Sequence, residues 1–167
     1  HYARGVALAR QGDFAGARAE AAALDAIVDE TDLTGLEAQY MPARDLLTIA
    51  RLVVEARIAQ AGQDYAGAEA KLREAIALEE AVPYMEPPYW YYPVRQTLGA
   101  VLLQQGRADD AVAVFQEALA RSPRNGWVLW GLAEAQRATG DAGLAQTEAA
   151  LEAAWLGDEA LLSLDRL

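Results

Sequence analysis

Aromatic side chains form the two groups of residues in this sequence that best suit a binding role. The first group is consecutive and consists of Tyr89, Trp90, Tyr91 and Tyr92, and the second consists of Trp127 and Trp130. Four of the six prolines lie between residues 83 and 93 and stiffen the first group, which lowers the entropic cost of holding its rings in place. We expect both groups to contact a partner. The alternative is that the first group fills space left by a longer connection.

Residues for catalysis or metal binding are scarce. The chain has no Cys, a single His at position 1, and Ser only at positions 122 and 163. These residues provide neither a catalytic triad nor a His or Cys metal site. The acidic pairs Glu79-Glu80 and Asp109-Asp110 fall at expected helix ends, and no glycine-rich phosphate loop is present. We therefore expect no enzyme activity, no metal and no cofactor.

The charge of the chain limits its partners. The formal net charge is −11 and the sequence pI is about 4.5. Nucleic acids and anionic membrane surfaces attract clustered Lys and Arg, so we expect neither as a partner. A neutral or basic protein segment is favoured instead. The lack of Cys suits either the cytoplasm or the periplasm, with the cytoplasm favoured.

The elements that must position these residues are helices. The chain contains 38 Ala and 22 Leu among 167 residues, whereas Val, Ile and Thr together number 20. Ala and Leu favour helices, and β-branched residues favour strands. The composition therefore predicts an all-α fold, and the length allows one domain.

A helix–glycine–helix pattern recurs along the chain. Gly106 and Gly140 are 34 residues apart, as are Ala111 and Ala145. Similar turns occur at Gly12 and Gly62, with longer spacings. The pattern predicts four units, at about 1–30, 48–82, 92–125 and 126–156, with residues 31–47 and 83–91 outside it. We expect all four glycines at turns, Ala111 and Ala145 at close helix contacts, and Phe115 buried.

Residues 92–125 resemble a tetratricopeptide repeat, through Leu98-Gly99, Ala111, Phe115 and Pro123. The aromatic and proline-rich stretch is also similar to that of bacterial tetratricopeptide repeat proteins of ill-defined function. The resemblance implies a right-handed superhelix of helix pairs, a solenoid, with a capping helix over 157–166. A four-helix bundle is the alternative fold.

The same resemblance implies a binding face. In this family the first helix of each pair lines a concave groove that holds a peptide or a helix of a partner. The positions carried over are Gln96, Ala100 and Leu103 in the third unit, and Trp127, Trp130, Glu134 and Arg137 in the fourth. Equivalent positions of adjacent repeats are neighbours, so we expect the two aromatic groups to border one surface.

Three functions remain open at this point. The first is a non-catalytic protein-interaction module. The second is a structural or self-assembly module that packs on its own chain or forms a homo-oligomer. The third is an accessory domain of a longer enzyme, because the chain begins with His inside an expected helix and so reads as a piece of a longer protein.

Overall fold

The computed structural model describes all 167 residues, and its regular elements are all helices. The all-α fold expected from the composition is therefore confirmed, and it is the helical repeat type of fold. Two compact units, His1–Val94 and Arg95–Leu167, are described separately below. None of the helices combines the length and the apolar character that crossing a bilayer requires.

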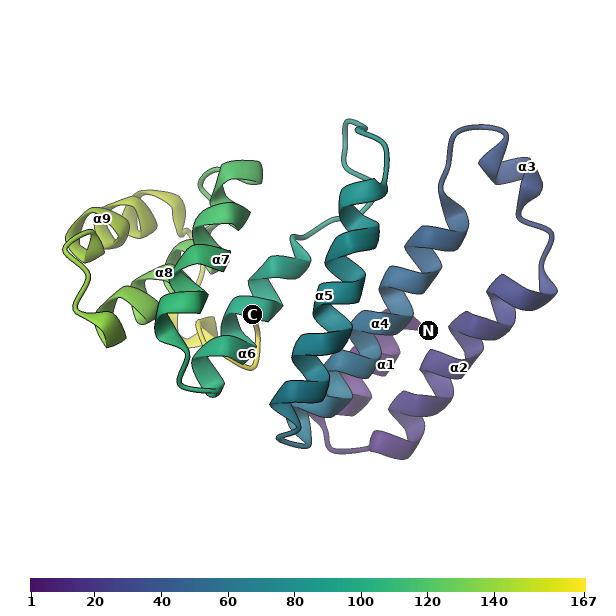
Figure 1. Cartoon of the computed structure of the whole chain (residues 1–167), viewed down its shortest axis with the longest axis horizontal. Coiled ribbons are helices and arrows are strands. Elements are labelled where there is room, and N and C mark those ends of the chain that lie inside the picture. The colour runs from purple at the N-terminus through teal and green to yellow at the C-terminus, as the bar shows by residue number, and fades with distance from the viewer. The chain divides into compact units, whose positions relative to one another are not determined.

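The first unit is built around one long helix. Its helices are α1 (Tyr2–Arg10), α2 (Phe14–Glu30), α3 (Thr34–Glu37), α4 (Ala43–Ala61) and α5 (Tyr65–Ala81). Helix α4 packs against α1, α2 and α5 (Figure 1). Val54 of α4 is fully buried, and a Cβ on Gly5 of α1 would lie 2.8 Å from its Cγ1 atom. The missing side chain at Gly5 therefore lets α1 and α4 approach closely.

The second unit is centred on one phenylalanine. Its helices are α6 (Val94–Gln104), α7 (Ala108–Arg121), α8 (Gly126–Thr139) and α9 (Leu144–Ala154). Phe115 of α7 is fully buried, as the repeat pattern predicts. A Cβ on Gly99 of α6 would lie 2.4 Å from Cζ of Phe115. A Cβ on Gly131 of α8 would lie 2.5 Å from the same atom. The Phe115 ring thus occupies space that two glycines leave open.

Each helix pair turns at a residue in the left-handed conformation. These residues are Gly12, Gly106 and Gly140, with φ of 81°, 75° and 71°. In the second pair the left-handed residue is Gln63, with φ of 62°, whereas Gly62 has φ of −79°. Gly62 therefore lies at the turn as expected, but one residue before the position that favours glycine.

Replacing Gln63 by Gly is expected to stabilise the first unit by about 1 kcal/mol, because glycine reaches the left-handed conformation without the steric cost that other residues incur. The matched control is Gly106→Ala, which has open space around its Cβ and adds only backbone strain. That variant is expected to lose about 1 kcal/mol. Urea denaturation of both variants measures the two changes, and equal signs would contradict the assignment of the turn.

The alanine after each turn is buried in the first three pairs. Ala17, Ala68 and Ala111 are fully buried. Ala145, expected at the same contact, is exposed, so that prediction is wrong. The reason is a late helix start, because Asp141 Oδ1 accepts a hydrogen bond of 2.6 Å from the Gly143 amide and α9 begins only at Leu144. The contact position is consequently taken by Thr147, which is buried.

The shift of α9 gives a direct test. Ala111→Leu is expected to lower the free energy of unfolding by about 2 kcal/mol, since a larger side chain overpacks a fully buried site. Ala145→Leu is the matched control and is expected to change it by less than about 0.5 kcal/mol. Thermal melts of the two variants compare them. Equal losses would mean that Ala145 is a contact residue after all.

The segment after α9 contains no regular α-helix. Where a capping helix was expected over 157–166, the structure has one 3₁₀ turn at Glu159–Leu161. Asp158 caps this turn, since its side chain accepts a hydrogen bond from the Ala160 amide. Leu167 is fully buried, so the segment still covers apolar surface of the second unit.

Candidate functional site

Asn125 fixes the first turn of α8, and with it two of the predicted tryptophans. Its Oδ1 atom accepts hydrogen bonds from the amides of Trp127 and Val128, at 3.1 and 3.3 Å. Its Nδ2 atom donates to Gln96 Oε1 of α6 at 3.4 Å. Such a cap satisfies helix amides that have no partner within the helix. The hydrogen bond to Gln96 therefore links the start of α8 to α6. Trp127 lies in this first turn of α8, and Trp130 follows one turn later.

A third tryptophan packs on this first turn. Trp155, just after α9, meets Trp127 edge to face with ring centroids 4.9 Å apart and planes at 82°. A Cβ on Gly126 would lie 2.8 Å from Cε3 of Trp155, so the glycine makes room for the Trp155 ring. Edge-to-face pairs are favourable for aromatic rings. The segment after α9 is therefore anchored on α8 through Trp155.

These contacts border a pocket of about 620 Å³ between α8, α9 and the segment that follows. Its apolar side chains are Trp130, Leu151, Trp155 and Leu162. Its charged side chains are Glu148, Glu152 and Glu159, all acidic. A pocket of this size that combines apolar side chains with polar groups is able to hold a ligand.

The pocket carries unbalanced negative charge. Arg137 of α8 pairs with Glu134 and, at 2.7 Å, with Glu148. The hydrogen bond to Glu148 is the main cause that raises the pKa of the Arg137 guanidinium. Glu152 and Glu159 make no ion pair, and both are exposed. A cationic group that enters the pocket would therefore find two carboxylates without a counterion.

A second pocket, in the first unit, is electrically different. It measures about 480 Å³ and lies among residues of α2, α4 and α5. Its Glu55 accepts from Arg51 and pairs with Lys71, both at 2.8 Å, while Arg51 also pairs with Asp25 at 2.7 Å. Partial burial raises the pKa of Glu55, but the bonds from Lys71 and Arg51 outweigh it and hold that pKa below its usual range. The charges in this pocket neutralise one another.

A group of aromatic residues in the first unit packs on itself. Tyr2 of α1 and Trp90, Tyr91 and Tyr92 form contacts with ring centroids 4.9–6.2 Å apart. Burial, and next the neighbouring Tyr92, raise the pKa of Tyr2 far above its ordinary value. Tyr91 remains 73% exposed. Trp90 and Tyr92 are half-buried, so much of this group's surface is used within the unit.

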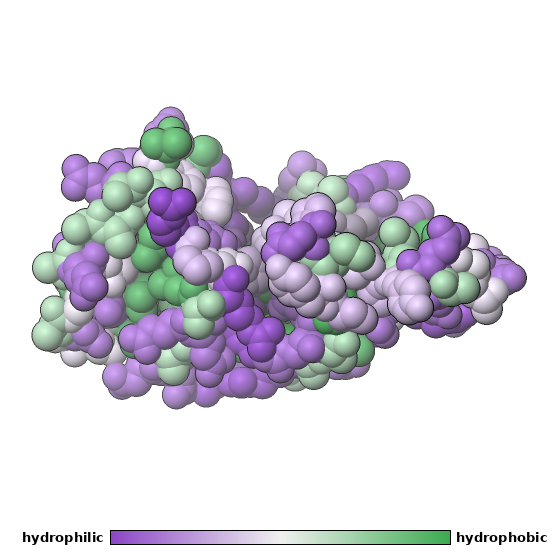
Figure 2. All heavy atoms as spheres, turned by 90° about the horizontal axis from the view of Figure 1, so that it is seen from above, coloured by the Kyte–Doolittle hydropathy of each residue, from purple (hydrophilic) through white to green (hydrophobic).

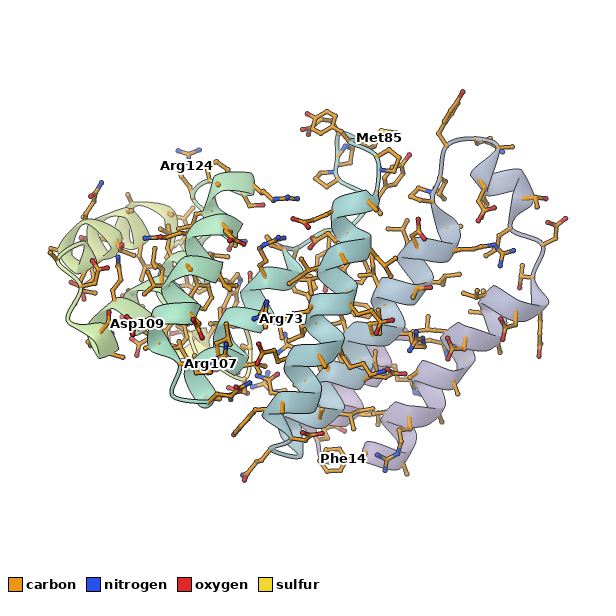
Figure 3. All side chains as sticks on the ribbon, viewed as in Figure 1. Phe14, Arg73, Met85, Arg107, Asp109 and Arg124 are labelled. Carbon is orange, nitrogen blue, oxygen red and sulfur yellow. The ribbon has the colours of Figure 1, made fainter.

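Two loops of the first unit meet beside this group. The Tyr89 hydroxyl donates to the main-chain oxygen of Tyr40 at 2.8 Å, which ties residues 82–93 to the loop before α4. Tyr40 and Tyr84 are 83% and 85% exposed, and Met85 lies at the loop tip (Figure 3). Figure 2, which views the molecule from above, shows a cluster of pale residues of intermediate hydropathy near the middle of the view, with hydrophilic residues around it. The sequence did not indicate that Tyr40 lies beside the aromatic residues 89–92.

The predicted site residues fall into three groups in the structure. Trp130 lines the acidic pocket, and Trp127, Glu134 and Arg137 adjoin it through Trp155 and Glu148. Gln96 is buried, with 6% of its surface exposed. The residues from Tyr89 to Tyr92 belong to the first unit. That the two aromatic groups border one surface stays a prediction.

Comparison with known proteins finds a similarity within the second unit. Residues 102–161 match the family model described as tetratricopeptide repeat. This stretch of the second unit is therefore similar to tetratricopeptide repeats. Such repeats are typically non-catalytic and generally mediate protein–protein interaction or scaffolding. Neither the curated proteins nor the solved structures compared with the chain give a match.

The matched repeats contain most of the pocket, including residues that sequence reasoning did not select. Glu148, Leu151, Glu152 and Trp155 are spaced by three, one and three residues, which places them on one face of α9. This spacing was readable in the sequence. It was missed because the tetratricopeptide repeat pattern directs attention to the first helix of each pair, and these residues lie on and just after the second.

Proposed function

We propose that this chain is a non-catalytic interaction module that binds a basic, partly apolar segment of a partner protein at the acidic pocket. In this proposal Trp130 and Trp155 contact the apolar part of the segment, and Glu152 and Glu159 contact its Lys or Arg side chains. Trp127, Glu134 and Arg137 support the pocket from α8.

One observation carries the proposal. Apolar side chains and two unpaired carboxylates surround the same pocket of about 620 Å³. Tryptophan is among the residues that most often dominate binding at interfaces. The face of a tryptophan ring also attracts Lys and Arg, and this attraction adds to that of the carboxylates. A long basic side chain has an apolar stem and a charged head, and so matches both parts of the pocket.

The unpaired carboxylates of the pocket favour a positively charged partner over a negatively charged one. The pocket in the first unit has a similar size, but its acidic groups are already paired with Arg51 and Lys71. A basic segment would have to displace those cations, whereas Glu152 and Glu159 are available at once. The net charge of −11 also speeds the approach of a basic partner at low salt.

A random peptide library displayed on phage tests the proposal. Selection against the full chain is expected to enrich peptides that carry Lys or Arg beside aromatic or aliphatic residues. The same selection against the double variant Glu152→Lys, Glu159→Lys is expected to lose that enrichment. Enrichment of acidic peptides, or the same peptides from both proteins, would contradict the proposal.

A further inference from the structure

Arg137 of α8 is a cation beside the acidic pocket, whose own lining residues include none. Its Nη2 atom donates a hydrogen bond of 2.7 Å to Oε1 of Glu148 on α9, and Glu148 lines the pocket. Its Nη1 atom donates to Oε1 of Glu134, three residues earlier on α8. The guanidinium thus joins a carboxylate of its own helix to one on the second helix of the pair.

Glu148 has a neighbour of the same charge on α9. Glu152 follows it by four residues, a spacing that places two side chains on one face of a helix, and both line the pocket. Glu148 is paired with Arg137, whereas Glu152 makes no ion pair. A cation that reaches Glu152 therefore lies one helical turn from a carboxylate that Arg137 already occupies.

The pair between Arg137 and Glu148 matters more for the pocket than for the fold. Both side chains are 49% exposed, and an ion pair exposed to this degree contributes little to folding stability. It does relieve the repulsion between two glutamates four residues apart. Within the pocket, however, the same pair decides whether two or three carboxylates are available to a cation that binds there.

We propose that Arg137 is a specificity-determining residue of the acidic pocket and limits its attraction for basic segments by keeping Glu148 from the ligand. With Arg137 in place the pocket presents two carboxylates, and its apolar side chains carry a larger share of the selection. Without Arg137 a third carboxylate is available, and positive charge alone counts for more. This inference rests on the function proposed above, whose binding site it shares.

The test measures, by fluorescence anisotropy at low salt, the affinity of the full chain for a fluorescein-labelled basic peptide from the phage selection described above. Arg137→Gln is expected to bind it about 3-fold more tightly than the wild type, which is the scale of an exposed ion pair. Arg137→Lys keeps a cation beside Glu148 and is expected to gain less. Arg124→Gln is the matched control, because it changes the net charge equally at an exposed residue that does not line the pocket, and it is expected to bind like the wild type.

A Glu148→Gln background shows whether the released carboxylate carries the gain. In that background Arg137→Gln is expected to tighten binding by clearly less than about 3-fold, because no carboxylate is released. Equal gains in the two backgrounds, or equal gains from Arg137→Gln and Arg124→Gln, would overturn the inference, since net charge alone would then explain them. Unchanged or weaker binding by Arg137→Gln, with its helices intact by circular dichroism, would also overturn it and is the result that a purely structural role predicts.

These outcomes are distinguishable from a failure of the function proposed above. Wild-type binding of the peptide that the double variant Glu152→Lys, Glu159→Lys leaves unchanged would refute the acidic pocket as the binding site, and the inference with it. Binding that this double variant abolishes but Arg137→Gln does not tighten would refute the role of Arg137 alone.

Discussion

Gly99→Ala is expected to lower the free energy of unfolding of the second unit by about 2 kcal/mol. A Cβ at this position would lie 2.4 Å from Cζ and 2.5 Å from Cε1 of Phe115. The ring is fully buried and Gly131 blocks its retreat on the other side, so it cannot move away without disturbing α8. Overpacking costs about 1–3 kcal/mol or more, and the helix preference of Ala over Gly offsets about 1 kcal/mol of it.

A double-mutant cycle isolates the contact between the two residues. In a Phe115→Leu background the ring is gone, and Gly99→Ala is expected to cost less than about 1 kcal/mol. Gly35→Ala is the control, because a Cβ there meets no atom within 4 Å, and it is expected to be neutral or slightly stabilising. Denaturation followed by tryptophan fluorescence measures these changes. Strict additivity of Gly99→Ala and Phe115→Leu would show that the ring is not what excludes the side chain.

Trp130→Ala is expected to weaken binding of a selected basic peptide by about 2 kcal/mol or more, which is roughly 30-fold in Kd. Trp130 is the side chain that α8 contributes to the pocket, and its loss removes both apolar contact area and the ring face that attracts a cation. Isothermal titration of the folded variant gives the affinity.

Leu156→Ala is the matched control for this loss. Leu156 follows Trp155 directly and is 97% exposed, but it does not line the pocket. Its truncation is expected to leave the affinity unchanged, and circular dichroism checks that both variants keep their helices. A peptide that binds the two variants equally well would show that the pocket is not the site.

The repeat pattern predicts the parts of this fold that depend on local sequence. Gly106 and Gly140 lie in turns that need a residue in the left-handed conformation. Phe115 and Ala111 are buried at positions that the 34-residue spacing defines. Gly99 belongs to the same pattern. Each of these residues acts within one helix pair or against the next pair along the chain, so a repeat motif suffices to place it.

The features that sequence reasoning missed depend on details outside the repeat. Ala145 is exposed because one side-chain bond, from the Gly143 amide to Asp141, delays α9 by two residues relative to the pattern. The pocket needs Trp155 to pack on Gly126, and Leu167 reaches α6 only through a segment with no repeat counterpart. The contacts of Trp155 and Leu167 join residues that are far apart in sequence, and no spacing along the chain encodes them.

The four tryptophans provide the most direct test of the acidic pocket as the binding site. Each indole N–H gives a separate signal in a ¹H–¹⁵N spectrum, and the chain has one such group at Trp90, Trp127, Trp130 and Trp155. Titration with a selected basic peptide at low salt is expected to shift the signals of Trp130 and Trp155, which line the pocket, and to leave that of Trp90 in the first unit unchanged. Saturable shifts of Trp90 with none at Trp130 and Trp155 would contradict the account.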